Sequence, residues 1–401
     1  MKTSYSQPAV CLLSGILFVL VSLAPHGSKG LVPVAQGELF VNAEARTTYD
    51  SNVYRNRDEV GDVSLTLTPE LQFIRDAGVL HLDARAGVAV QRYLDENPLD
   101  AEDFYFEAGL IYPVAPGEPQ RTRQTLNLFY RERTTVVEDN WGRTTVVEDF
   151  GEVTETRNFG GDYGVRYRLT EKLATRGRLL AERWNYRRGR FSDRNTYSAS
   201  SDLIWLYSPK LDFFTGYRFR RVETRRRLEG IRDVSSRDHQ VSVGAEGELL
   251  PKVTGAVRVG YQYRDFDDRE RGGRDQLSFD VDVDWDATGQ TSLALGAGRD
   301  FRTSADERNV DSTLVYLSAT HRLTDPVRLD ARTSYQHERF GSAAGRPGRT
   351  DHRYGIEGGA RYSLTERASA ALAYRFQRRE SDEARFTYNR HIVDASVLFR
   401  F

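Results

Sequence analysis

The feature that most constrains this chain is an alternation of apolar and polar residues that recurs from residue 38 to the chain end. In LFVNAEARTTY (39–49), Leu39, Val41 and Ala43 share one face, whereas Asn42 and Glu44 lie on the other. A period of two is typical of β-strands, because successive side chains point to opposite faces. Eighteen such segments are centred near residues 44, 68, 86, 108, 127, 163, 179, 202, 217, 244, 259, 281, 296, 317, 333, 358, 373 and 394. Each has about ten residues or slightly more, enough for a tilted strand to cross a bilayer.

The connections between these segments alternate in length. Short, turn-like connections lie at 75–78, 170–172, 208–210, 250–252, 286–290, 324–326 and 365–367. Longer, strongly charged connections lie at 187–194, 223–238, 265–275, 340–351 and 380–386. Short periplasmic turns opposite long outer loops are typical of outer-membrane barrels. The sequence therefore predicts an all-β fold, a single transmembrane antiparallel β-barrel of about 18 strands over residues 31–401.

The first thirty residues differ from the rest. Lys2 precedes an apolar run from about residue 10 to residue 24, which predicts a signal peptide (1–30) cleaved between residues 24 and 36. The only cysteine, Cys11, lies in this leader, so the mature chain has no thiol for disulfide or redox chemistry. The 57 basic and 58 acidic residues nearly balance, which argues against a nucleic-acid partner.

The apolar faces carry aromatic residues close to the short turns. These are Tyr112, Tyr167, Trp205, Tyr207, Trp285, Tyr362 and Phe401. Aromatic girdles mark the boundary between lipid and water, so we expect outer-membrane lipid and lipopolysaccharide to surround the barrel. The last strand ends in VDASVLFRF, where Phe399 and Phe401 share a face. We interpret these two residues as a membrane-assembly signal for the barrel assembly machinery.

The opposite faces carry charges at strand centre that lipid would not accept, and we expect them to line a water-filled lumen. The candidates are Arg85, Glu107, Asp202, Arg218, Glu246, Arg258, Asp280, Asp282, Asp284 and Arg361. The three aspartates belong to DVDVDWD (280–286), which lacks the glycine of a calcium loop and alternates like a strand. We interpret them, together with Asp286, as a carboxylate column on the lumen wall, neutralised in part by Arg258, Gln262 and Arg264, with a cation site as the alternative.

The longest outer connection, residues 132–155, contains the heptapeptide RTTVVED twice, ten positions apart. One interpretation is a tandem duplication that lengthened an outer loop or hairpin, with DNWG as its turn. The other is a loop folded into the pore, where Glu138, Asp139, Glu148 and Asp149 would form an electrostatic constriction. The sequence leaves both open.

Catalytic and cofactor motifs give no comparable signal. The seven histidines are scattered without metal-ligand spacing, and no nucleophile–base arrangement or Gly-rich phosphate loop is evident. We therefore predict no enzyme activity, no metal and no cofactor.

The segment TYDSNVYRNRDEV (48–60) resembles the start of a family of outer-membrane porins, the beta-barrel porin 2 type, which is often encoded with exopolysaccharide systems. The turns YRLTEK and LYSPK and the VLFRF terminus are similar as well, so the resemblance spans nearly the whole mature chain. It implies a role in polysaccharide passage across, or assembly at, the outer membrane, with polysaccharide cargo and export proteins as partners. It supplies no catalytic residues.

The predicted function is thus a porin-like outer-membrane channel involved in export or assembly of an extracellular or capsular polysaccharide. Two alternatives stay open. One is a general diffusion porin for hydrophilic solutes, and the other is a structural or adhesive barrel that conducts nothing. Channel selectivity would come from the charged wall.

Overall fold

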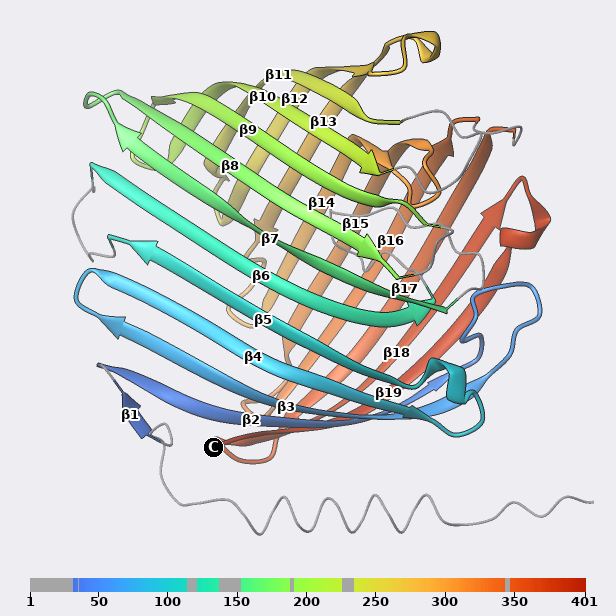
Figure 1. The fold of residues 1–401 in the computed structure, drawn as a ribbon. Coiled ribbons are helices and arrows are strands. Elements are labelled where there is room, and N and C mark those ends of the chain that lie inside the picture. Colours follow the sequence, from blue (N-terminus) through green and yellow to red (C-terminus); the bar gives the residue numbers. More distant parts are fainter. Residues whose placement is uncertain are drawn as a thin grey trace, which may run out of the picture.

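The chain folds into a closed antiparallel β-barrel of eighteen strands (Figure 1). It is seen in a computed structural model, which describes residues 32–34, 36–113, 121–136, 153–187, 191–225, 234–342 and 347–401. Every strand pairs with its neighbours in sequence, and the last pairs with the first long strand to close the ring. The predicted fold class is confirmed, and each of the eighteen predicted centres falls within a strand.

The barrel strands are β2 (Gly37–Asp50), β3 (Asp62–Ala77), β4 (Leu80–Tyr93), β5 (Ala101–Tyr112), β6 (Thr122–Val136), β7 (Val153–Arg168), β8 (Leu173–Tyr186), β9 (Asp193–Leu206), β10 (Leu211–Arg225), β11 (Ser236–Leu250), β12 (Val253–Phe266), β13 (Arg274–Trp285), β14 (Thr291–Thr303), β15 (Asn309–Arg322), β16 (Val327–Phe340), β17 (Arg349–Ser363), β18 (Ala368–Ser381) and β19 (Tyr388–Arg400). A three-residue strand, β1 (Val32–Val34), pairs with the start of β2. Three short 3-10 helices lie in outer connections: η1 (Asn97–Leu99), η2 (Arg269–Arg271) and η3 (Ala384–Phe386). Among the described residues, no helix is long and apolar enough to span a membrane.

The two ends of the barrel differ as the loop lengths predict. The short turns gather at the end where β2 begins and the chain terminates, and the long connections with the 3-10 helices gather at the other end (Figure 1). In outer-membrane barrels the short-turn end faces the periplasm. We call the two ends the short-turn end and the outer end.

The ring closes between β19 and β2. Their pairing runs from Ile392 opposite Asp50 to Arg400 opposite Asn42. At the short-turn end, the last residue extends this ladder, because Phe401 N donates to Val41 O at 2.8 Å and Val41 N donates to Phe401 O at 3.1 Å. The terminal phenylalanine is therefore part of the closure.

The same seam is fastened at the outer end by the segment that carries the family resemblance. Arg390 on β19 donates from Nε to Asp50 at 2.9 and 3.0 Å, and both side chains are buried. Asn52 donates from Nδ2 to the carbonyl of Asn389 at 3.2 Å, and Val53 packs in a small cluster with Leu99. The motif thus ties the first outer loop to the last strand, which is a structural role.

The outer surface of the wall is apolar, and the described residues form no single hydrophobic core beneath it. Large hydrophobic side chains such as Leu203, Val241, Leu277 and Ile356 are half exposed or more, as expected where lipid replaces water. The buried apolar residues form only small clusters, for example Ala174, Ile204 and Phe214. This arrangement inverts the pattern of a water-soluble domain.

Two predicted features lie wholly or mainly outside the described residues. One is the signal peptide (1–30). The other is the duplicated loop, of which only its flanks are described: Arg133–Val136 continue β6 and pair with Val153–Thr156 of β7. The four acidic residues Glu138, Asp139, Glu148 and Asp149 are outside the described part of the chain.

Candidate functional site: the charged interior of the barrel

Contacts between distant strands identify the face that points inward. Arg166 on β7 donates to Glu246 on β11 at 3.0 Å, and Arg218 on β10 donates to Asp300 on β14 at 3.2 Å. Both pairs join strands four places apart, which lie roughly 19 Å apart along the wall at the usual strand spacing. Side chains can meet over that separation only on the concave side of the wall. This face carries the charges, and the apolar face points to lipid.

A first ion-pair network lies toward the short-turn end. Asp202 on β9 accepts from Arg176 at 2.7 and 2.9 Å and from Arg258 at 2.9 and 3.0 Å. Arg176 also donates to Glu246 at 2.7 Å. The Arg258 guanidinium lies 4.3 Å from the centroid of the buried Phe214 ring, so a cation–π contact also stabilises this network.

A second network lies toward the outer end and is more deeply buried. Asp238, which is 1% exposed, accepts from Arg220 at 2.7 Å and from Arg264 at 2.6 and 2.7 Å. Asp300 accepts from Arg220 at 2.8 and 3.0 Å and from Gln262 at 2.7 Å. Buried charges of this kind are tolerated only when their hydrogen-bonding groups are satisfied, so each partner depends on the other.

The second network also holds a strand that leaves the wall. β14 pairs with β13 only as far as Arg299. Beyond that point, guanidinium groups take over two of its carbonyls: Arg220 donates to the carbonyl of Phe301 at 2.8 Å, and Arg264 donates to that of Arg302 at 3.0 Å. Arginine side chains thus bond the backbone of β14 beyond the end of its pairing with β13.

The tip of the β14–β15 hairpin consequently lies inside the barrel. Every residue from 303 to 310 is buried. Ser192, in the connection between β8 and β9, donates from its backbone N to Ala305 O at 3.0 Å, and its hydroxyl donates to Glu307. The tip therefore reaches a connection five strands away and narrows the interior near the outer end. We call residues 303–310 the inward tip.

The sequence did not predict the inward tip. The predicted constriction residues lie in the duplicated loop, outside the described residues. The connection Ser304–Arg308 is short and has no unusual composition. Its position depends on bonds to arginines that are distant in sequence, and a period-two pattern carries no such information.

The aspartates of β13 form the expected column on the inward face. Most of their cross-strand neighbours are small. Asp280 faces Gly298 on one side and Arg258 on the other, Asp282 faces Ala256 and Gly296, and Asp284 faces Thr254 and Ala294. Asp282 and Asp284 are exposed to solvent although the wall encloses them. The Tyr316 ring covers Gly296, whereas Asp282 and Asp284 on the neighbouring strand still reach water.

The three side chains that were expected to neutralise the column make hydrogen bonds to other carboxylates. Arg258 stands opposite Asp280 in register but its guanidinium bonds Asp202. Arg264 bonds Asp238, and Gln262 donates to Asp300. Asp238 is the register neighbour of Arg264 on β11, whereas the concave wall brings Asp202 on β9 and Asp300 on β14 within reach of Arg258 and Gln262.

The remaining interior candidates lie on the far side of the barrel. Arg85 donates to Glu107 at 2.8 Å, and Glu107 also accepts from Arg131 at 2.7 Å. Tyr105, on the same strand as Glu107, donates its hydroxyl to Glu70 at 2.7 Å. This side of the wall is thus polar as well, with carboxylates bound by arginine and tyrosine.

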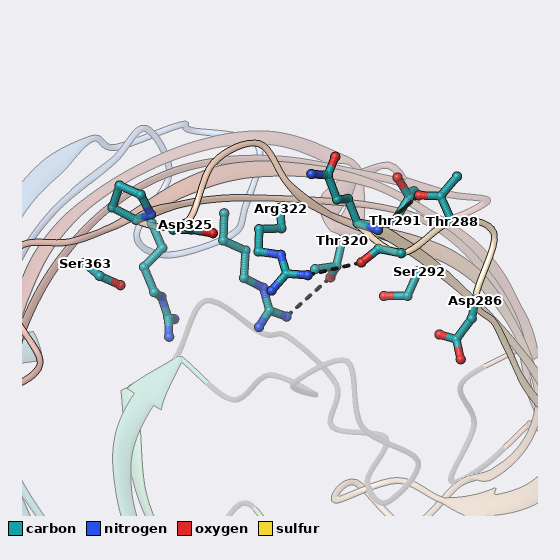
Figure 2. Close-up of a pocket in the computed structure, with 13 residues that line it drawn as sticks. Asp286, Thr288, Thr291, Ser292, Thr320, Arg322, Asp325 and Ser363 are labelled. Carbon is teal, nitrogen blue, oxygen red and sulfur yellow. Dashed lines mark hydrogen bonds between the residues drawn. The ribbon is translucent and has the colours of Figure 1, made fainter.

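Arg361 belongs to a cavity at the short-turn end (Figure 2). The cavity has a volume of about 470 Å³. Its lining comes from β13 to β17 and their turns: Asp286, Thr288, Gly289, Gln290, Thr291, Ser292, Thr320, Arg322, Asp325, Pro326, Arg328, Arg361 and Ser363. In Figure 2 the side chains of Asp286, Arg322 and Ser363 point to the same side of the strand arc. Guanidinium, carboxylate and hydroxyl groups therefore meet at one mouth of the barrel.

No metal centre accompanies these groups. Within the described ranges, no three His, Cys, Asp or Glu side chains are grouped so that they could hold a metal ion. Asp280, Asp282 and Asp284 all come from one strand, β13, and they form no such group.

Several solved structures are similar in fold to this chain. OccK3 (OpdO) of Pseudomonas aeruginosa is 12% identical with a TM-score of 0.45, and the alignment covers 90% of this chain and 95% of that protein. OccAB2 of Acinetobacter baumannii is 9% identical with a TM-score of 0.48, covering 94% and 100%. The siderophore receptor PirA of Pseudomonas aeruginosa is 10% identical with a TM-score of 0.45, covering 94% and 81%. No curated relative matches the sequence.

The family assignment rests on a different match. The model of the family described as "Putative beta-barrel porin 2" matches residues 39–401, which is the whole barrel from β2 to the last residue. The match agrees with the closed eighteen-strand wall, its apolar outer surface and its charged interior. The chain belongs to this β-barrel porin family, and it is a porin-like barrel of the outer membrane.

Proposed function

We propose that the barrel is a channel for hydrophilic, saccharide-based solutes and that it serves the export or assembly of an extracellular polysaccharide. The family supports the channel. The polysaccharide cargo is supported by the chemistry of the interior, where guanidinium, carboxylate, amide and hydroxyl groups offer the hydrogen bonds that sugar hydroxyls need. The proposal is a transport function and includes no catalytic step.

One observation carries the proposal. Strand β13 has solvent-exposed carboxylates, Asp282 and Asp284, on the inward face of a closed wall. An interior filled by side chains would bury these groups instead. Gly298 and Ala256, which have little or no side chain, border these carboxylates and leave a polar solute room along this part of the wall.

A second candidate is a barrel that conducts nothing. It is favoured by the inward tip, because residues 303–310 are buried and bonded to the opposite connection at Ser192. A tip held in this way narrows or closes the outer half of the interior. The two candidates differ in one measurable property, ion flow through a single barrel.

Planar-bilayer recording of purified, refolded protein separates the two. The channel proposal predicts discrete conductance steps, and replacement of Ser304–Arg308 by a short Gly-Ser linker raises the step size because it removes the inward tip. Absence of steps in both proteins would overturn the channel. A deletion strain tests the cargo, since unchanged surface polysaccharide would remove the polysaccharide role and leave a general diffusion porin.

A further inference from the structure

Three arginines face one another in the cavity at the short-turn end. Arg322 near the end of β15 is in register with Arg328 at the start of β16, and Arg328 is in register with Arg361 on β17. Residues directly opposite in neighbouring strands have Cβ atoms about 4.5–5.5 Å apart, and like charges in such positions repel. We call these residues the arginine row. A row of three cations at this spacing requires anions beside it.

The protein supplies little of that negative charge. Arg328 bonds Asp330 at 3.2 Å. Arg322 donates to a carbonyl, that of Gly289, at 3.1 Å. In the described part of the chain, Arg361 makes no hydrogen bond or ion pair. One bound carboxylate therefore stands against three guanidinium groups.

The two acidic residues that line the same cavity do not fill this gap. Asp286 and Asp325 belong to the lining, but no ion pair joins either of them to the arginine row within the described residues. In Figure 2, Asp286 lies on the far side of Thr320 and Ser292 from Ser363. The carboxylates border the cavity, and the guanidinium groups remain available to a ligand.

A similar row elsewhere in the barrel shows the contrast. Arg123, Arg166 and Arg176 are also in register on β6, β7 and β8. There, Arg166 bonds Asp212 at 2.6 Å and Glu246 at 3.0 Å, and Arg176 is bound by two carboxylates as described above. Carboxylates of the protein thus bind two members of that row, Arg166 and Arg176, whereas only one member of the arginine row has such a partner.

The cavity around the arginine row suits an oxygen-rich ligand. Five hydroxyl side chains belong to its lining: Thr288, Thr291, Ser292, Thr320 and Ser363. Its volume of about 470 Å³ lies within the range of small-molecule sites, roughly 300–1,000 Å³. The lining includes no aromatic side chain, so recognition would come from charge and hydrogen bonds.

We propose that the arginine row is a binding site for the carboxylate groups of an acidic saccharide at the short-turn end of the channel. Guanidinium groups present paired N–H donors that match a carboxylate in two-point geometry, and the hydroxyls serve the sugar. Because the short-turn end faces the periplasm, the site meets a polymer that enters for export. The inference rests on the proposed function for its direction, but the binding itself does not depend on conduction.

The test is calorimetric binding to the full-length, refolded barrel in detergent. The probes are a galacturonic acid tetramer, a neutral maltotetraose and inorganic phosphate. We expect the acidic tetramer to bind wild-type protein, and the double variant Arg328→Gln/Arg361→Gln to bind it about tenfold or more weakly, as loss of charge-assisted bonds predicts. Arg361→Lys, which keeps the charge, should retain part of the affinity.

The matched control is Arg75→Gln. Arg75 lies at the same end but on the outward face with Leu71 and Phe73, so its removal should leave binding unchanged. Equal affinity of the double variant and wild type would overturn the site. Equal affinity for maltotetraose or for phosphate would overturn the acidic saccharide as ligand. Conductance of the same proteins is recorded separately, so a barrel that binds but does not conduct would remove the channel function and leave this site intact.

Discussion

The buried carboxylate of Asp238, bound by Arg220 and Arg264, gives the sharpest test of how ion pairs stabilise the interior. Asp238 accepts both Arg264 bonds, at 2.6 and 2.7 Å, and Arg220 at 2.7 Å. In Asp238→Asn, one oxygen becomes an NH₂ group that points at guanidinium donors. We expect the variant to fold with a reduced free energy of unfolding.

The size of the loss follows from these contacts. A hydrogen bond to a charged group contributes about 1.5–3 kcal/mol. The Arg264 Nε bond is made to Oδ1 and the other two bonds to Oδ2, so at least one bond becomes a donor–donor contact whichever oxygen is replaced. Removing one partner of a buried ion pair costs about 3–5 kcal/mol. Asp300 still binds Arg220 and offsets part of the charge, so we expect a loss near the lower figure, about 3 kcal/mol.

The assay is equilibrium urea unfolding in phospholipid vesicles, followed by tryptophan fluorescence. The control is Asp267→Asn, which removes the same charge from an outer connection where Arg221 bonds Asp267 at 2.5 and 2.7 Å. A pair at the surface contributes about 1 kcal/mol or less. If both variants lost the same free energy, or if Asp238→Asn lost less than the control, the reasoning about burial would be refuted.

Three further predictions concern the closure, the wall and an outer loop. Deleting Phe401 removes two backbone bonds to Val41 and should reduce the folded, heat-modifiable fraction in outer-membrane preparations, whereas Arg385→Gln in the outer connection should not. Gly160→Ala should reduce the free energy of unfolding by about 1–3 kcal/mol in the same assay, because a Cβ there would lie 2.2 Å from the carbonyl oxygen of Ala181. Gly358→Ala, with open space around the added Cβ, should change it by less than about 1 kcal/mol. Equal effects of the two substitutions would contradict this prediction. The hydrogen bond from Tyr54 to Glu96 raises the pKa of Tyr54 to about 12. The contact between these outer loops should therefore be fully present at a pH below the usual tyrosine pKa of about 10, and it should be lost as the pH rises toward 12. Ultraviolet titration, with Tyr54→Phe subtracted, should show a lower Tyr54 pKa in Glu96→Gln, and an unchanged value would contradict the assignment.

The sequence predicts the wall of this barrel well, because strand alternation and loop length are local properties. The segment around Asp280 shows this, since each second residue from Asp280 to Asp284 lies on the inward face as the pattern requires. Some partners of the inward charges lie on strands that are not adjacent. Arg258 bonds Asp202 rather than its register neighbour because the wall is curved, and curvature follows from closure of the whole ring.

The inward tip and the arginine row were missed for related reasons. The tip depends on arginines from β10 and β12 that bond the backbone of β14, which no local pattern encodes. The row needs the register of β15, β16 and β17, and only Arg361 of its three members was recognised as a candidate. Two charged residues at the ends of neighbouring segments, Arg322 and Arg328, were the available signal, because a short turn fixes their register.

The most direct test of the account is solvent accessibility along β13. The only cysteine of the chain is Cys11, in the predicted leader, so single cysteines at positions 280 to 284 can carry a spin label without interference. In lipid vesicles, labels at 280, 282 and 284 should be accessible to a water-soluble nickel relaxant, and those at 281 and 283 to oxygen dissolved in the lipid. Loss of this alternation, with all five positions equally wet or equally dry, would contradict a closed wall that has lipid on one side and water on the other.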